Sequence, residues 1–291
     1  DKSMQSALDQ QQTGEVILID DISTDGSWEK CEAWVMKDKR VRLFRNEGIK
    51  GAGAARNVGL LNATFEYIAF LDADDYYLDG RFDVDEQLFE KIPNLLITAN
   101  TTEIVTAMNN KKSGLNAIFN RGTKIRFPNS FSKVTVYDFY AGGTLHLNGI
   151  TIKQTAIKKA GMFDVDLKQS EDTDFIFRLL QTGLVLSTDV GNIKAVYNIH
   201  HSNTISHFSE ATYNRRKAAK KHFHLALNNN LKYSLIWKFF KDFMEYDYLW
   251  YFGKNHVYKK GIKLFLIPFF LHRIFSRTDP EYDKDRTIHL T

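Results

Sequence analysis

The first two thirds of the chain alternates between short apolar runs and segments with the spacing of amphipathic helices. The strand candidates are residues 16–19, 67–71, 97–105, 117–119, 131–140 and 145–152, of which 131–140 has the pattern of an edge segment. The helix candidates are residues 2–12, 154–160 and 175–180, and a glycine ends each of the last two. This alternation up to about residue 200, with only four prolines in the chain, predicts an α/β doubly wound sheet.

The apolar run at residues 67–71 ends abruptly in three carboxylates, Asp72, Asp74 and Asp75. In open α/β sheets, ligands bind just beyond the carboxyl ends of the strands. Three acids at such an edge repel one another unless a positive group lies among them. A Mg²⁺ or Mn²⁺ ion carrying a diphosphate meets that need, because these ions prefer oxygen ligands. The alternative interpretation is an acidic, solvated turn.

Three further segments favour a phosphate-binding site. The apolar run at residues 16–19 also ends in acids, including Asp21, and a Ser/Thr/Asp/Gly cluster that can cap a helix follows it. Residues 46–59 form a glycine-rich loop that leads into a helix carrying Arg56, and helix N-termini attract phosphate. The acidic segment at residues 170–175 opens another helix, although acids in a first turn also stabilise the helix dipole.

Together these segments resemble the family 2 glycosyltransferases, which are inverting enzymes of the GT-A fold that use nucleotide-activated sugars. The resemblance covers roughly residues 5–205. The matching motifs, in order, are Asp20-Asp21-x-Ser23-Thr24-Asp25, Asn46-x-Gly48, Ala55-Arg56-Asn57-x-Gly59, Phe70-Leu71-Asp72-Ala73-Asp74-Asp75, Gly161-x-Phe163-Asp164 and Ser170-Glu171-Asp172-Thr173-Asp174-Phe175. The fold expected from the resemblance is a GT-A-like doubly wound mixed sheet with a Rossmann-like nucleotide-binding half.

The resemblance also assigns roles to individual side chains. It implies that Asp21 contacts the nucleotide base, Arg56 lies near the nucleotide, Asp72 contacts the ribose, Asp74 binds Mn²⁺ or Mg²⁺, and Asp172 is the catalytic general base. Some GT-A enzymes use a late histidine as a further metal ligand, and His200 is the candidate here, with a plain surface loop as an equal alternative. The implied donor is a nucleotide diphosphate sugar, with UDP favoured, and the implied acceptor is a glycan or a lipid-linked glycan.

Two features qualify the resemblance. The family opens with a strand of the type Val-Ser-Ile-Ile-Ile-Pro-x-Tyr-Asn, whereas this sequence starts at Asp1, in the region of the family's first helix. We expect the natural protein to contain that strand, because a sheet without it would expose apolar edges. The family's processive synthases carry a Gln-x-x-Arg-Trp motif and membrane-spanning helices. The sequence shows neither, which favours the addition of a single sugar.

The composition changes beyond residue 210. Residues 211–291 contain sixteen Lys or Arg and seven Asp or Glu, a net charge of +9, whereas residues 1–210 carry −5. We therefore expect a glycosyltransferase domain at residues 1–210 and a basic, aromatic-rich helical region at residues 211–291. Such a region can lie on an anionic membrane, pack against the catalytic domain or form a homodimer contact.

Composition also bounds the setting. The apolar run at residues 262–271 is too short for a bilayer, which needs about 20 residues. The single cysteine, Cys31, excludes an internal disulfide. We expect a cytoplasmic enzyme, either free or peripheral on the inner face of the plasma membrane, and no nucleic-acid partner, because no recognised binding motif is present.

Two alternative functions remain at this point. A sugar-nucleotide pyrophosphorylase has a related nucleotide-binding sheet, but its glycine-rich, Arg-containing loop would follow the first strand, and the acidic segment at residues 170–175 argues against it. A non-catalytic nucleotide-sugar-binding relative would be expected to have lost one of the acids. All of them are present.

Overall fold

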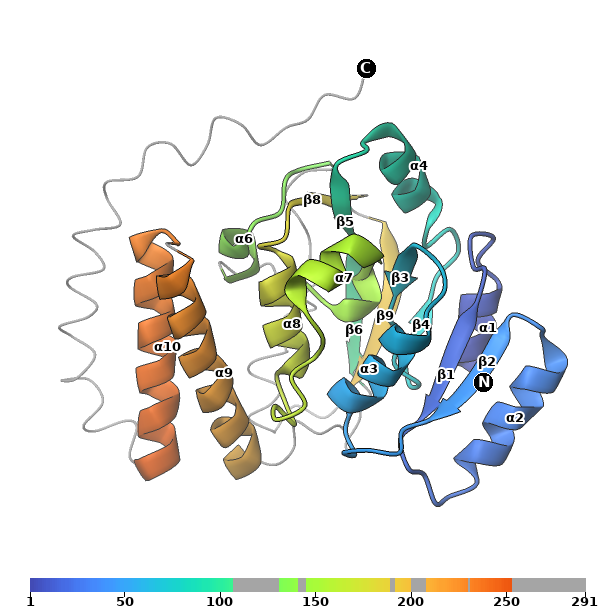
Figure 1. Ribbon diagram of the computed structural model, residues 1–291, viewed down its shortest axis with the longest axis horizontal. Helices are drawn as coiled ribbons and strands as arrows, with labels where there is room; N and C mark the ends of the chain where they lie inside the picture. The colour runs from blue at the N-terminus through green and yellow to red at the C-terminus, as the bar shows by residue number, and fades with distance from the viewer. Residues whose placement is uncertain (107–130, 141–144, 189–191, 200–207, 230, 253–291) are drawn as a thin grey trace. The chain divides into compact units, whose positions relative to one another are not determined.

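A computed structural model describes residues 1–106, 131–140, 145–188, 192–199, 208–229 and 231–252. The chain forms two compact units, which are described separately. The first contains the described residues within Asp1–Val165 and Phe175–His201, and the second contains those within Asp166–Asp174 and Ser202–Arg286. The mixed α/β architecture predicted from the sequence is confirmed (Figure 1).

The first unit begins with a parallel strand pair. Its opening elements are α1 (Lys2–Leu8), β1 (Val16–Asp20), α2 (Ser27–Lys37), β2 (Val41–Arg45) and α3 (Ala52–Asn62). β1 and β2 run parallel in register, from Val16 opposite Val41 to Asp20 opposite Arg45. A small core joins them to α1 and α2, and its buried members are Met4, Leu8, Trp34 and Val41. The parallel pairing brings the polar ends of the two strands to the same edge.

A four-stranded mixed sheet has the order β3-β7-β5-β8. Its strands are β3 (Tyr67–Ala69), β7 (Ile150–Lys153), β5 (Leu95–Ala99) and β8 (Leu184–Ser187). β7 is antiparallel to both of its neighbours, and β5 is parallel to β8. Leu95, Ile152 and Val185 are fully buried, as expected for strands covered on both faces. Helices α4 (Asp83–Lys91), α7 (Gln154–Ala160) and α8 (Glu171–Leu179) accompany this sheet in the chain.

A three-stranded sheet has the order β4-β9-β6. It contains β4 (Tyr76–Tyr77), β9 (Ile193–Ile199) and β6 (Thr101–Thr106). β9 pairs antiparallel with β4 and parallel with β6. Because β4 directly follows the Asp72–Asp75 acids, this pairing carries the end of β9 to the same place.

β1 and β3 each have a strand edge without a partner among the residues that the structure describes. β1 pairs only with β2, and β3 pairs only with β7. Apart from Asp20, no residue of β1 or β3 is fully buried, and Tyr67 on β3 is 41% exposed. The expectation of a strand preceding residue 1 stays a prediction.

Some local predictions need correction. Residues 131–140 were expected as an edge segment, but residues Val136–Tyr140 form the helix α6, and before it Lys133 makes an isolated bridge to Leu186. The reason is a capping box, because Thr135 and Asp138 exchange side-chain to backbone hydrogen bonds at the helix start. The candidate strand at residues 117–119 lies outside the described residues.

Two other strand predictions are confirmed in part. The strand predicted at residues 97–105 is divided at Asn100, whose backbone N–H donates to the carbonyl of Gly149 at 2.6 Å. The strand predicted at residues 145–152 starts only at Ile150, after a short 3₁₀ turn, η1 (Leu147–Gly149). His146 caps this turn through Nδ1, which accepts from the backbone N–H of Asn148 at 3.3 Å.

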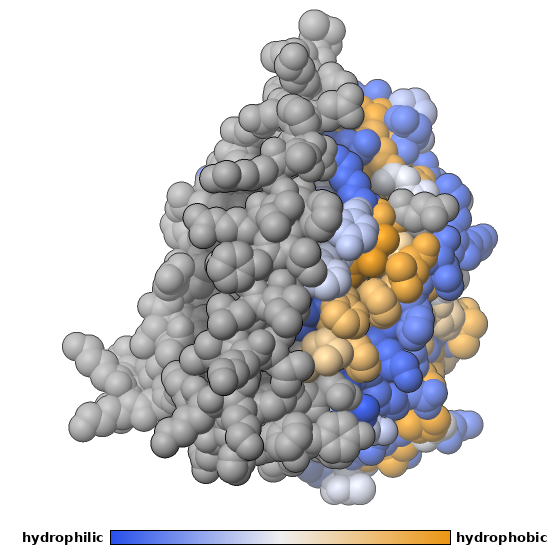
Figure 2. Space-filling view, turned by 90° about the vertical axis from the view of Figure 1, so that its left-hand side faces the viewer, coloured by the Kyte–Doolittle hydropathy of each residue, from blue (hydrophilic) through white to orange (hydrophobic). Residues whose placement is uncertain are grey.

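The second unit contains two long helices, α9 (Phe208–Asn228) and α10 (Tyr233–Phe252), together with the first turn of α8. α9 and α10 pack against each other through aromatic side chains, including Phe223 against Phe240 at 5.5 Å. The predicted helical C-terminal region is therefore present. In the described part of the chain, no helix has both the length and the apolar character needed to cross a bilayer. The described residues visible in Figure 2 are a mixture of hydrophilic and hydrophobic side chains.

Candidate functional site

The three acids that follow β3 lie in three different environments. Asp72 accepts a hydrogen bond from Arg56 Nη2 at 2.7 Å, and its side chain is 36% exposed. Asp74 is exposed, whereas Asp75 is 1% exposed. Asp74 is therefore exposed to solvent, Asp72 is paired with the Arg56 guanidinium, and Asp75 is buried.

Asp75 is held by two asparagines from distant parts of the chain. Its Oδ2 accepts from Asn148 Nδ2 at 2.6 Å, and its Oδ1 accepts from the backbone N–H of Asn198 at 2.8 Å. Asn198 Nδ2 also donates to the carbonyl of Asp74 at 2.6 Å. Burial raises the pKa of Asp75 to about 7; the two asparagine hydrogen bonds oppose this shift, and the neighbouring Asp74 and Asp72 add to it. The buried Asp75 carboxylate therefore holds the turn in place through these hydrogen bonds.

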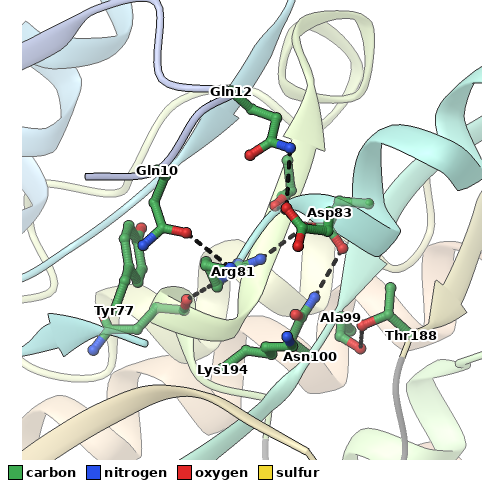
Figure 3. A network of polar contacts seen from close by, with 12 residues as sticks. Gln10, Gln12, Tyr77, Arg81, Asp83, Ala99, Asn100, Thr188 and Lys194 are labelled. Atoms are coloured by element: carbon green, nitrogen blue, oxygen red, sulfur yellow. Dashed lines mark hydrogen bonds and ion pairs between the residues drawn. The ribbon is translucent and has the colours of Figure 1, made fainter. Parts of the chain in front are cut away.

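A buried ion pair supports the same region. Arg81 Nη1 donates to Asp85 Oδ2 at 2.7 Å, and Arg81 Nε donates to the carbonyl of Asn148 at 3.1 Å. The backbone N–H of Arg81 donates to Gln10 Oε1 (Figure 3), and Asn100 Nδ2 donates to Asp85 Oδ1. The network thus connects the region after α1 and the break between β5 and β6 to the asparagine that holds Asp75.

The start of α3 places Arg56 beside the acids. Its neighbour Asn57 exchanges two hydrogen bonds with the backbone of Phe163, at 2.9 and 2.8 Å. The ring of Phe163 stacks on Phe175 at 4.0 Å and meets Phe70 edge-on at 5.4 Å. The sequence motif around Gly161 and Phe163 therefore anchors α3 so that Arg56 reaches Asp72.

Asp21 organises the glycine-rich loop. Its carboxylate accepts from Asn46 Nδ2 at 2.7 Å and from the backbone N–H of Gly51 at 2.9 Å. Gly51 has a φ of 149°, a conformation that disfavours a side chain, and it is the residue before α3. Asp21 therefore fixes the loop that leads to the N-terminus of α3, next to the position from which Arg56 extends.

Asp172 lies in the second unit, whereas Asp21, Arg56, Asp72 and Asp74 lie in the first. It occupies the first turn of α8 and is partly exposed. Its Oδ1 accepts from the backbone N–H of its neighbour Thr173 at 2.6 Å. Two residues further on, Asp174 is fully buried and accepts from Lys221 Nζ at 3.0 Å. The two acids of this turn thus differ in the same way as Asp74 and Asp75.

The carboxylates after β3 fit a divalent cation that takes most of its oxygen ligands from the phosphates of a bound substrate. Within the described ranges, no group of three or more His, Cys, Asp and Glu side chains could enclose a metal ion. Mg²⁺ and Mn²⁺ need no such cage when phosphates supply the remaining oxygens, since one or two carboxylates then suffice. Asp74 is exposed and offers that carboxylate. His200, the other predicted ligand, lies outside the described residues.

The sequence did not reveal the residues that support these acids. Asn148 and Asn198 stand 73 and 123 positions from Asp75, and neither belongs to a recognised motif. Arg81 and Asp85 have helical i,i+4 spacing, which on its own indicates a solvated surface pair, yet their side chains are 0% and 2% exposed. The one usable signal was Asn148 as a polar residue within an apolar run.

Comparisons with known proteins give one similar solved structure and two relatives by sequence. TarS of Staphylococcus aureus, in a crystal structure of residues 1–349 with UDP-GlcNAc, superposes with a TM-score of 0.64 at 18% identity, covering 88% of this chain and 70% of that one. The chain is 43% identical over 77 residues to the UDP-Glc:alpha-D-GlcNAc-diphosphoundecaprenol beta-1,3-glucosyltransferase WfaP of Escherichia coli, which is 26% of this chain and 30% of that one. It is 28% identical over 188 residues to the minor teichoic acid biosynthesis protein GgaA of Bacillus subtilis (strain 168), which is 61% of this chain and 39% of that one.

The mixed α/β fold of the chain is similar to that of TarS and is GT-A-like. Residues 1–142, just under half of the chain, match the model of Glycosyl transferase family 2, and this segment is therefore similar to that family. The chain spans about a third of the length of the first curated relatives that it matches.

Proposed function

We propose that the protein transfers a single sugar from a nucleotide diphosphate sugar to a hydroxyl group of a glycan or lipid-linked acceptor, with inversion at the anomeric carbon. The observation that carries this proposal is the turn after β3, where Asp72 pairs with Arg56 and Asp74 faces solvent at the carboxyl end of a strand. The match of residues 1–142 to a glycosyltransferase family favours sugar transfer over the pyrophosphorylase alternative.

The nucleotide would lie along the segment from the glycine-rich loop to the acids. Asp21 holds the loop and would contact the base, while Arg56 supplies positive charge near the nucleotide. Asp72, already oriented by Arg56, would accept a hydrogen bond from a ribose hydroxyl group. UDP is the favoured nucleotide, because TarS binds UDP-GlcNAc and WfaP uses UDP-Glc by its name.

Asp74 would hold Mn²⁺ or Mg²⁺ together with the diphosphate, with His200 as a second candidate ligand. The cation, when bound, would neutralise the negative charge that develops on the leaving diphosphate. Asp75 contributes by fixing the turn, through the hydrogen bonds from Asn148 and Asn198.

Asp172 would take the proton from the acceptor hydroxyl group as that oxygen attacks the anomeric carbon. One of its oxygens is engaged by Thr173, which leaves the other for the acceptor. Proton transfer that accompanies attack needs a correctly placed carboxylate more than a strongly shifted pKa. Attack from the face opposite the leaving diphosphate inverts the anomeric centre, as in other single displacements at a sugar.

The proposed metal role is tested by Asp74→Ala, with Asp79→Ala as the matched control because Asp79 is also an exposed acid close by in the chain. Asp74→Ala should weaken Mn²⁺-dependent binding of UDP about a hundredfold or more, since the carboxylate anchors the cation to the diphosphate. Isothermal titration calorimetry with and without Mn²⁺ measures this. Equal affinities in the two variants would refute the role of Asp74.

The proposed base is tested by Asp172→Asn, which keeps the shape and the hydrogen bond from Thr173. We expect UDP-sugar affinity to be retained and transfer to fall by about 10² or more. A panel of nucleotide sugars, assayed for hydrolysis and for transfer to a lipid-linked glycan, identifies the donor first. Wild-type turnover in Asp172→Asn would reduce this acid to a helix-stabilising residue.

We further propose that the enzyme acts in the cytoplasm in cell-envelope polysaccharide synthesis, at the inner face of the plasma membrane. GgaA, whose name places it in teichoic acid biosynthesis, supports this pathway class. α9 is basic, and both α9 and α10 carry exposed apolar side chains, including Tyr213 at 40% and Tyr233 at 59% exposure. Such surfaces suit contact with anionic lipid, and a homodimer contact is the competing use.

A further inference from the structure

The first turn of α8 is tied to α9 by a buried carboxylate. Asp174 exposes none of its side chain, and its Oδ2 pairs with Lys221 Nζ at 3.0 Å. Its Oδ1 lies 3.4 Å from His222 Nε2. A carboxylate is expensive to bury unless a charge and hydrogen bonds accompany it. Its burial against these two neighbouring α9 residues therefore fixes where α9 meets α8.

The α9 side of this contact is itself anchored. The side chain of His222 is 4% exposed, and its ring meets Phe239 of α10 edge-on at 5.9 Å. Phe239 is 1% exposed. One turn earlier on α9, Lys217 Nζ donates to the carbonyl of Asp166, just before the helix, at 3.0 Å. Residues of α9 therefore contact both the first turn of α8 and the segment that leads into it, and α10 packs behind them.

The geometry of α8 relates the contacts of Asp174 with Lys221 and His222 to the position of Asp172. Residues i and i+2 of an α-helix lie about 200° apart around the helix axis. Asp172 therefore points away from the face that carries Asp174. The helix entry is also conformationally unusual, because Ser170 has a φ of 67°, which is uncommon for a residue other than glycine. A turn with such an entry needs outside contacts to keep its orientation, and the contacts at Asp174 provide them.

We propose that Lys221 and His222 are positioning residues for Asp172. By holding Asp174 they fix the first turn of α8 in the orientation that presents Asp172 to the acceptor hydroxyl group. The helical pair α9 and α10 then serves the chemistry directly, in addition to any contact with a membrane. This inference rests on the proposed role of Asp172 as the base.

The test compares Lys221→Met with Lys220→Met. Lys220 is the adjacent lysine and is exposed, so its loss removes the same charge from the same helix without touching Asp174. In Lys221→Met we expect faster amide hydrogen exchange at residues 171–176, a kcat lower by about tenfold to a hundredfold and a donor KM changed by less than about twofold. Lys220→Met should match the wild type, and Lys221→Arg should restore most of the lost kcat.

The double variant Asp174→Asn with Lys221→Met separates positioning from folding. It leaves no buried charge unpaired, so its melting temperature should recover, whereas kcat should stay low because α9 no longer holds the turn. Recovery of both, or a wild-type kcat in folded Lys221→Met, overturns the proposal. If the wild type transfers no sugar from any donor, the proposed function fails; unchanged hydrogen exchange in Lys221→Met overturns the positioning contact by itself.

Discussion

Replacing the buried Arg81 tests the network beneath the acid turn most directly. The Arg81 side chain is 0% exposed, and Arg81→Met replaces it with a long apolar side chain that lacks the guanidinium group. The variant loses the hydrogen bonds to Asp85 at 2.7 Å and to the carbonyl of Asn148 at 3.1 Å. It also loses the stacking of the guanidinium over Phe82, 4.8 Å from the ring centroid.

The magnitude follows from what remains. Asp85 keeps the hydrogen bonds from Asn100 and Thr151, but its negative charge is then buried without a cation. Breaking a buried pair from one side destabilises a protein by about 3–5 kcal/mol, because an uncompensated charge is left behind. For a chain of this size each kcal/mol shifts the melting temperature by about 2–4 °C, so a fall of about 6–20 °C is expected.

The measurement is thermal unfolding followed by circular dichroism, with Lys153→Met as the control. Lys153 also forms an ion pair, with Glu66 at 3.1 Å, but Glu66 is 56% exposed. A surface pair contributes at most about 1 kcal/mol, which corresponds to a shift of a few degrees. Adding Asp85→Asn to the Arg81 variant should destabilise by less than the sum of the two single changes, since the unpaired charge disappears. If Arg81→Met melts no lower than Lys153→Met, the reasoning about this network is wrong.

Three further outcomes are expected. In Gly149→Ala the new Cβ would lie 2.7 Å from the carbonyl oxygen of Asn100, so unfolding in urea should show a loss of about 1–3 kcal/mol. Asn57→Ala leaves the backbone N–H and carbonyl of Phe163 without their side-chain partner; steady-state kinetics should show a raised donor KM, and an unchanged KM would contradict the anchoring of α3. Replacing the exposed Arg215 by Gln should weaken binding to anionic vesicles about fivefold at low salt, because each basic side chain near such a surface contributes about 1 kcal/mol; equal sedimentation of variant and wild type would count against membrane contact.

The acid turn could be predicted because its signal is local. An apolar run that stops at a row of carboxylates predicts a strand end with polar chemistry, and β3 does end at Ala69, just before Asp72. The helix that contains Arg56 could also be predicted from the sequence, because a glycine-rich loop precedes it. Both signals depend only on neighbours in the chain.

The division of labour among the acids could not be predicted. Asp74 and Asp75 are identical in type and adjacent in sequence, and only the pairing of β4 with β9 brings Asn198 to Asp75 and leaves Asp74 exposed. The same holds for Asp172 and Asp174, because the partner of Asp174 comes from Lys221, 47 positions away. A periodicity argument places each acid on an element but does not say which side chain from a distant element will meet it.

The helix α8 starts in one compact unit and ends in the other, since the boundary falls between Asp174 and Phe175. No cut at a single position therefore separates a complete catalytic half from a dispensable tail. A version of the protein that stops near residue 210 would retain Asp174 but lose Lys221 and His222, and so would open a buried carboxylate to water. Shortened versions that lose activity would for this reason say little about membranes, and questions about the surface of α9 are better asked with single exposed side chains in the intact chain.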